Sequence, residues 1–424
     1  MPIENNFQHD ELSRKNPGER LTVCDVTPTA LPESPIGQET MAALGVRLSH
    51  AGVRVIVLLH GSIMGTDVFG MQRLDEVGGL KRGYSRGVAG LDALLAAMRE
   101  ESNGLTGPEG LRPPLKNDDL TKELMDNHVR DAGNFTTAYV ESFKKAINQR
   151  APTSIACLRE LWSCENHHLG RAISACVLLD RLRALVTEHK LDTGDRILVQ
   201  AHGQAGLVLA LATNLLCPSP IIGRKKLFEL LTSYAQQSRD DDLSTVIQRI
   251  DPLLASHTLL NGVMLDVVTL GTPVRYGWDP SGLGKLLHIV NHRTLRTDGK
   301  TWLSKMELPQ ITMEMPIAWG GDYIQELAVA GSDALPTTDA AKAANKALWE
   351  LVEPFDGFER WLECARRAVR IPGEGLGILA DYKDSTGSTN VRDHYYGHAA
   401  YTRLNAMLFN TTEIVHALYG TTSR

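Results

Sequence analysis

The stretch that decides the fold is Asp195-Arg-Ile-Leu-Val-Gln-Ala-His-Gly-Gln-Ala-Gly-Leu-Val-Leu-Ala-Leu-Ala-Thr-Asn-Leu-Leu216. Its beginning, up to Gln200, is a short apolar run typical of a buried parallel strand, and residues 207–216 form an apolar run typical of a buried helix. Small residues at positions 201 and 205 leave room for a sharp turn between the two. The sequence therefore predicts a strand, a tight turn and a helix, with Gly203 at the turn because glycine tolerates strained backbone angles.

Similar apolar runs recur along the chain and end in polar, glycine-containing turns. They cover residues 53–59, 155–162, 196–200, 263–270 and 327–330, with 376–380 as a further candidate strand. Helical patterning separates several of these runs, so the sequence predicts an α/β fold with a mainly parallel central sheet and helices on both faces. The carboxyl ends of parallel strands meet at one edge of the sheet, where we expect a single pocket.

The remaining segments suggest how the chain is divided. Residues 1–45 are rich in proline, glutamate and asparagine and are interpreted as an irregular N-terminal arm, followed by the α/β domain over residues 46–424. Two more polar segments, at about 78–150 and 218–258, are interpreted as insertions. We expect these insertions to form a lid or cap that shapes the pocket.

Composition limits the classes of function. The net charge of -6 and the sequence pI near 6.2 argue against a nucleic-acid-binding surface. No apolar run approaches the ~18 residues of a membrane span, and the polar N-terminus is unlike a secretory signal. The six cysteines lack zinc-site spacing and are expected to be free thiols. We therefore expect a cytoplasmic protein without an integral membrane segment, metal or cofactor.

Four motifs, taken in order, resemble the lipase and esterase branch of the α/β-hydrolase superfamily over roughly residues 50–424. His60-Gly-Ser-Ile-Met-Gly65 resembles the oxyanion loop, and residues 201–206 resemble the nucleophile elbow, a small-x-Ser-x-small turn. Thr269-Leu-Gly-Thr-Pro273 resembles a strand end common in lipases, and Gly397-His-Ala-Ala-Tyr-Thr402 resembles the loop that carries the catalytic histidine. The resemblance implies an α/β-hydrolase fold that acts on carboxylic esters by a Ser-Asp-His mechanism.

The chain order of this family, nucleophile then acid then histidine, implies three site residues. Gly203 stands at the nucleophile position, Asp333 is the implied acid, and His398 is the implied base. Asp333 follows the candidate strand 327–330, where a carboxylate could orient the imidazole. The acid could also be Asp381 or, less favoured, Asp322, which precedes that strand, and the histidine could also be His394.

The oxyanion hole is implied to use two backbone N–H groups, that of Gln204 and that of Ser62 or Ile63. Such donors persist whatever the side chain at position 203. A second chemical-looking cluster, Glu165-Asn-His-His168, lacks the spacing of a metal site and is interpreted as a pocket wall or a helix cap.

Glycine has no atom that can attack a carbonyl. The chain is therefore expected to be an esterase-like scaffold, inactive or nearly so, in which serine was replaced either by design or by natural loss. The intact Asp and His favour a recent or engineered replacement. The alternative is a non-catalytic protein that binds a small ester or acyl ligand, or a partner, in the same pocket.

Overall fold

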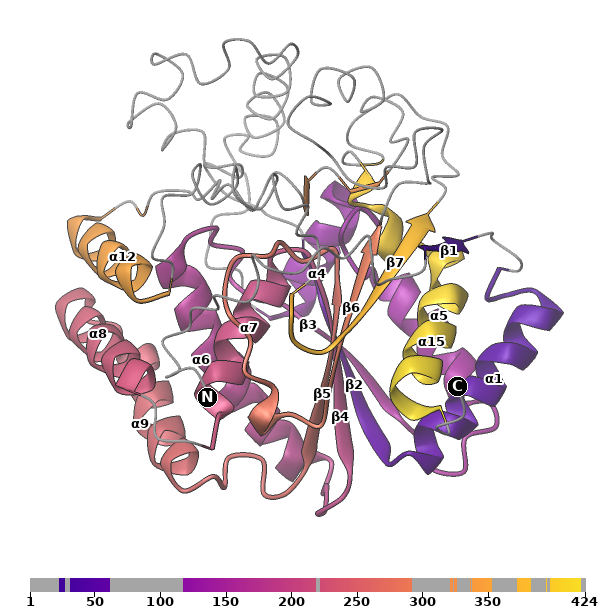
Figure 1. The fold of residues 1–424 in the computed structure, drawn as a ribbon, viewed down its shortest axis with the longest axis horizontal. Coiled ribbons are helices and arrows are strands. Elements are labelled where there is room, and N and C mark those ends of the chain that lie inside the picture. The colour runs from indigo at the N-terminus through magenta and orange to yellow at the C-terminus, as the bar shows by residue number, and fades with distance from the viewer. Residues whose placement is uncertain are drawn as a thin grey trace, which may run out of the picture.

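The computed structural model describes residues 23–26, 31–61, 117–218, 222–291, 321–322, 324–325, 336, 338–352, 372–382, 394 and 397–420. Its centre is a sheet of seven strands in the order β1-β7-β6-β5-β4-β2-β3, and every adjacent pair is parallel (Figure 1). The strands are β1 (Val23–Val26), β2 (Val53–Leu59), β3 (Ala156–Glu160), β4 (Arg196–His202), β5 (Met264–Leu270), β6 (Lys285–Asn291) and β7 (Leu376–Tyr382).

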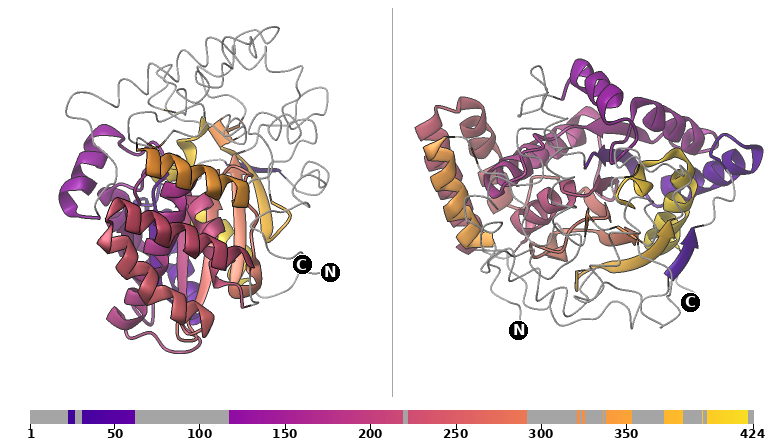
Figure 2. Two further views of the ribbon diagram at one scale, coloured as in Figure 1. Left: turned by 90° about the vertical axis from the view of Figure 1, so that its left-hand side faces the viewer. Right: turned by 90° about the horizontal axis from the view of Figure 1, so that it is seen from above.

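Helices cover both faces of the sheet, as Figures 1 and 2 show. One layer contains α1 (Pro35–His50), α5 (Thr137–Asn148) and α15 (Leu404–Tyr419), and the other contains α6 (His168–Glu188), α7 (Ala205–Leu216), α8 (Ile222–Ser238), α9 (Asp241–Ala255) and α12 (Asp339–Val352). A further helix, α4 (Asp119–His128), contacts α5.

Alternate residues of the central strands pack into two separate hydrophobic cores, one on each face of the sheet. Along β2, Ile56 and Leu58 belong to the core beneath α1, α5 and α15, whereas Val55 and Val57 belong to the core beneath α6 and α7. Because successive side chains of a strand point to opposite faces, a strand buried on both sides must be apolar throughout. This explains why the apolar runs predicted the central strands.

The α/β class predicted from the sequence is confirmed. The predicted strands at 53–59, 155–162, 196–200, 263–270 and 376–380 coincide with β2, β3, β4, β5 and β7, while the candidate at 327–330 lies outside the described residues. The apolar pattern does not predict β6, because Lys285, His288 and Asn291 interrupt it. His288 and Asn291 are nevertheless buried, and Lys285 is half-buried.

The prediction of an irregular arm over residues 1–45 is wrong for part of this segment. Strand β1 pairs with β7, and α1 starts at Pro35, with the side chain of Ser34 accepting a hydrogen bond from the Gly37 backbone N–H. A serine N-cap followed by proline in the first turn is a helix-start signal that the sequence carries. In the sequence this signal is easily missed because the segment as a whole is rich in proline.

The predicted insertions do not form a lid in the described part of the chain. Residues 222–255 are helical as expected, but α8 and α9 lie against α6 and α12 at the flank of the molecule, away from the edge where the strands end (Figure 1). Helix α5 packs on α1 and β3 and therefore belongs to a helix layer. Residues 62–116, the larger part of the first segment, lie outside the described residues.

Gly45 sets how closely α1 and α5 approach each other. A Cβ at this position would lie 1.8 Å from the backbone oxygen of Ile147 in α5. We expect Gly45→Ala to lower the free energy of unfolding by at least about 1–3 kcal/mol, because neither helix backbone can yield. Urea denaturation checks this, with the exposed Ala43→Gly as the matched control. If helix propensity alone set the outcome, Gly45→Ala would instead raise the free energy of unfolding by about 1 kcal/mol. Ala43→Gly would lower it by a similar amount.

His288 makes the fold sensitive to acid. Burial lowers the pKa of this histidine from 6.5 to about 3, and its Nδ1 lies 2.7 Å from the Thr269 hydroxyl. The folded protein thus keeps His288 neutral while the unfolded chain takes up a proton below pH ~6.5, so this contribution to stability is complete above pH 6.5 and is lost as the pH falls towards 3.

Unfolding of His288→Gln by urea at several pH values isolates this effect. As the pH is lowered from 6 to 4, we expect the free energy of unfolding of the native chain to fall more steeply than that of the variant. The difference in slope should approach about 1.4 kcal/mol per pH unit. Above pH 7 the two slopes should agree. Equal slopes at all pH values would show that His288 is protonated in the folded state.

Candidate functional site

The candidate site lies where the order of the strands reverses. Strand β3 lies on one side of β2, and β4 and β5 lie on the other side, so the connections leaving β2 and β4 diverge. In open parallel sheets this divergence leaves a crevice at the carboxyl ends of the strands. Gly61 follows β2 and Gly203 follows β4, which places both glycines at the carboxyl edge of the sheet beside this reversal.

The turn after β4 is tight and is centred on Gly203. Gly203 has φ +53°, a left-handed conformation that favours glycine. Its N–H donates to the Leu270 oxygen at 2.8 Å, and its own oxygen accepts from the Thr272 hydroxyl at 2.9 Å. A Cβ at Gly206 would lie 1.9 Å from that hydroxyl oxygen, so α7 begins in close contact with the end of β5. The neighbouring strand therefore holds the turn in place.

His398 and Asp322 form a dyad next to this turn. The Nδ1 atom of His398 lies 2.7 Å from Oδ2 of Asp322. The same carboxylate accepts hydrogen bonds from the Tyr401 hydroxyl at 2.9 Å and, on Oδ1, from the Gln325 backbone N–H at 2.8 Å. The Asp322 side chain is fully buried, whereas that of His398 retains 12% exposure. Three donors on one buried carboxylate fix the acid and leave the imidazole as the accessible member of the pair.

Asp322, not the preferred candidate Asp333, is the carboxylate that the structure places at hydrogen-bond distance from Nδ1 of His398. Asp333 lies outside the described residues. In the sequence Asp322 is disfavoured because it precedes the candidate strand at 327–330, and β6 gives no clear apolar signal that would mark it as an earlier strand. Its backbone N–H donates to the oxygen of Asn291, the last residue of β6, so Asp322 follows a strand in space although thirty residues intervene.

Asp381 and His394 do not form this dyad. Asp381 is in β7, paired with Asp25 of β1. His394 is buried, and its backbone oxygen accepts a hydrogen bond from Ala399. The ring that approaches the Cβ position of Gly203 is that of His398.

His398 lies closer to Gly203 than a triad histidine could. A Cβ at position 203 would lie 2.6 Å from Nε2 and 3.2 Å from Cε1 of this ring. Loss of a serine side chain alone would leave a gap of the size of a hydroxymethyl group between the imidazole and Cα. The ring instead fills much of that space, because glycine presents no side chain to hold it back.

His202, the residue before Gly203, contacts the backbone and the ring of His398. Its Nε2 lies 2.8 Å from the backbone oxygen of His398, and the two ring centroids are 4.2 Å apart. Burial and the proximity of His398 lower the pKa of His202 well below its usual value, so it is neutral and donates from Nε2. A Cβ at Gly61 would lie 2.2 Å from His202 Nδ1, which explains why glycine follows His60.

The backbone N–H of Gln204, one of the predicted oxyanion donors, comes directly after Gly203 at the start of α7 and makes no hydrogen bond to another described residue. The Gly61 N–H is engaged by the oxygen of Gly133 at 2.8 Å. Ser62 and Ile63, the predicted second donors, lie outside the described residues.

The histidine pair at 167–168 has a structural role, and its first member is a helix cap. His167 Nδ1 accepts a hydrogen bond from the Gly170 N–H and caps α6. His168 Nδ1 lies 2.7 Å from the Tyr276 hydroxyl, which also accepts from Arg171. In the part of the chain that the structure describes, no group of three or more His, Cys, Asp or Glu side chains could hold a metal ion.

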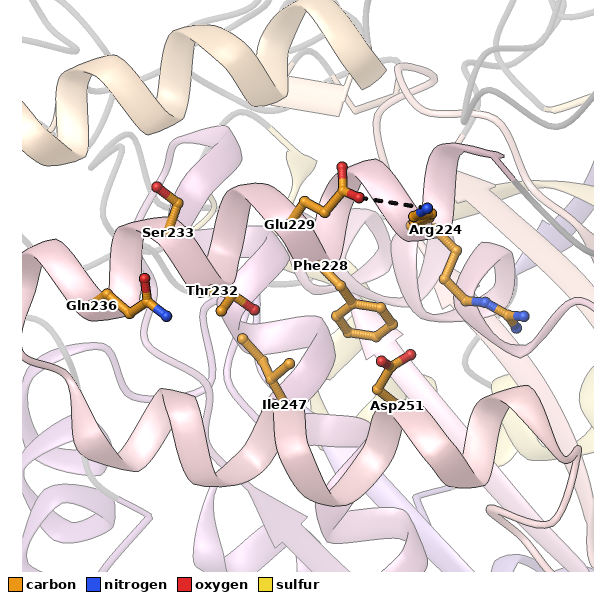
Figure 3. Close-up of a pocket in the computed structure, with 9 residues that line it drawn as sticks. Arg224, Phe228, Glu229, Thr232, Ser233, Gln236, Ile247 and Asp251 are labelled. Atoms are coloured by element: carbon orange, nitrogen blue, oxygen red, sulfur yellow. Dashed lines mark ion pairs between the residues drawn. The ribbon is translucent and has the colours of Figure 1, made fainter.

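A separate hollow of about 670 Å³ lies on α8 and α9 (Figure 3). Thr232, Ser233 and Gln236 line it with charged neighbours, including Lys225, which pairs with Glu229 at 3.9 Å. The residues that line the hollow include no histidine or cysteine, so its hydroxyl groups have no imidazole base beside them.

No helix within the described ranges has the length and apolar character needed to cross a bilayer. Comparison of the chain with protein-family models, with curated proteins and with solved structures found no match.

Proposed function

We propose that this chain has an α/β-hydrolase scaffold built for carboxylic esters, in which Gly203 stands at the position of the nucleophilic serine. A small ester or acyl compound would bind at the crevice between β2 and β4. As written, the chain lacks the side chain needed for serine catalysis, and removal of a triad nucleophile leaves only ~10³–10⁴-fold catalysis over water.

The observation that carries this proposal is the position of the Asp322–His398 dyad relative to the elbow. The imidazole is oriented through Nδ1 by a buried carboxylate, and its Nε2 faces the place where a Cβ of residue 203 would project. This is the mutual geometry that acyl transfer requires of base and nucleophile. The Gln204 N–H beside it suits an oxyanion.

The strand order supports the same scaffold. From β3 through β2, β4, β5 and β6 to β7, six parallel strands carry the loop glycine after β2, the elbow after β4, the acid after β6 and the histidine after β7. This is the nucleophile, acid, histidine chain order of α/β-hydrolases.

A second candidate function is non-catalytic binding of an ester or acyl ligand in the same crevice. Turnover by the Gly203→Ser variant separates the two possibilities. A catalytic scaffold gains hydrolysis of simple esters when serine is restored, whereas a binding protein with an altered pocket binds without turnover. Calorimetric binding of a non-hydrolysable phosphonate ester to the native chain provides the parallel measurement.

A further inference from the structure

We propose that His398 is itself a nucleophile in this chain. Its Nε2 would attack acyl donors whose leaving group departs as a stable anion, such as aryl esters and thioesters. This inference rests on the proposed function, since it uses the same elbow and oxyanion donor, but it assigns a reaction to the chain as written.

The first argument is the location of Nε2. In a serine hydrolase the base lies about 2.6–3.2 Å from the nucleophilic oxygen, which itself projects beyond Cβ. Here Nε2 lies 2.6 Å from the Cβ position of residue 203. At this distance the ring nitrogen intrudes on the space that a side chain of residue 203 would fill. Nε2 therefore lies beside the Gly203 turn, close to where the oxygen of a serine at this position would project.

The second argument is the protonation pattern of the ring. Asp322 accepts the Nδ1 proton, which leaves the lone pair of a neutral imidazole on Nε2. No described residue hydrogen-bonds to Nε2. The His398 side chain retains 12% exposure, so the ring is not sealed in the interior. Histidine is an established covalent nucleophile when it is held in this way.

The reaction balances without a further reagent. The Nε2 lone pair forms a bond to the acyl carbon, and the carbonyl π pair moves to oxygen, where the Gln204 N–H stabilises it. When the carbonyl re-forms, the bond to the leaving group breaks and the leaving group departs as an anion. Water then adds to the N-acylimidazolium, the C–N bond breaks, and a carboxylate, the neutral imidazole and two protons result.

The chemistry also sets the substrate class. In a triad, the histidine protonates the leaving alcohol after taking the serine proton. Here Nε2 is consumed by bond formation, so no general acid remains for the leaving group among the site residues described. Alkoxides leave poorly without a proton, whereas phenolates and thiolates do not need one. The native chain should therefore cleave aryl esters and thioesters but not alkyl esters.

The test uses p-nitrophenyl acetate and ethyl acetate with the native chain and four variants: Gly203→Ala, Gly203→Ser, His398→Gln and, as a matched control, the exposed His50→Gln. Release of p-nitrophenolate is followed by absorbance, and acid-quenched samples are mapped by mass spectrometry. We expect the native chain and His50→Gln to hydrolyse the aryl ester and to carry acetyl on His398, with no action on ethyl acetate.

Gly203→Ala is the critical variant. Its Cβ displaces Nε2 without adding an oxygen, so we expect at least a tenfold loss of aryl-ester hydrolysis, and His398→Gln should lose it entirely. Thermal unfolding of each variant shows whether it folds. Unchanged hydrolysis in Gly203→Ala, or acetylation spread evenly over several histidines, would overturn the proposal.

The inference and the proposed function fail differently. If Gly203→Ser hydrolyses both esters while the native chain shows no acetyl-His398, the histidine nucleophile is wrong and the scaffold assignment stands. If Gly203→Ser hydrolyses neither ester although it folds, the hydrolase scaffold itself is wrong.

Discussion

Gly203→Ser is expected to raise the hydrolysis of a short alkyl ester by several orders of magnitude, on the scale of the ~10⁶-fold loss seen when a triad nucleophile is removed. The substitution adds one hydroxymethyl group at a turn whose flanks, Ala201 and Ala205, are already small. Nε2 of His398 must withdraw from its 2.6 Å approach to the Cβ position, which converts it from a nucleophile into a base for the new hydroxyl. Hydrolysis of ethyl butyrate, followed by acid release, measures the gain.

The backbone conformation at position 203 limits the cost. A non-glycine residue at φ +53° is strained by about 1–3 kcal/mol, which the hydrogen bonds of Gly203 to Leu270 and Thr272 must offset. Gly203→Ala is the matched control, because it introduces the same Cβ and the same strain without an oxygen. Equal alkyl-ester rates in the two variants would show that the chemistry does not pass through this position.

In the Gly203→Ser background, Asp322→Asn is expected to lower kcat by about 10⁴-fold. The amide cannot accept the Nδ1 proton in the manner of a carboxylate, so the imidazole adopts the wrong tautomer or turns away. The Tyr401 hydroxyl and the Gln325 N–H already point at this carboxylate, so the geometry of the loop should persist. Steady-state kinetics on the same ester measures the loss, with KM expected to change little.

Asp333→Asn and Asp381→Asn in that background distinguish the candidate acids. Both variants should retain the activity of Gly203→Ser, because neither carboxylate is the one at 2.7 Å from His398 Nδ1. A large loss in Asp333→Asn combined with a small loss in Asp322→Asn would restore Asp333 as the acid.

The sequence predicts those residues of the candidate site that lie beside their own strand. The turn at Gly203 follows β4 directly, and its small residues and apolar flanks mark it. The motif that carries His398 likewise points to the residue that faces Gly203. In these cases local residue order and spatial order agree.

The position of Asp322 beside His398 cannot be predicted in the same way. Asp322 reaches the site through a backbone hydrogen bond to Asn291, and β6 has no clear apolar pattern because His288 sits in its middle. A buried histidine looks polar in sequence, although its low pKa keeps it neutral in the fold. The close approach of Nε2 to Gly203 depends on the loop from Gly397 onward and has no sequence signal.

The most direct test of the scaffold is covalent labelling of Gly203→Ser with a p-nitrophenyl phosphonate ester, read by intact mass and peptide mapping. A restored nucleophile beside the Asp322–His398 dyad should take up one phosphonyl group per chain, located at position 203. The label should be lost when His398→Gln is added. Absence of labelling in the folded variant, or a label on a different serine, would contradict the assignment of Gly203 to the nucleophile position.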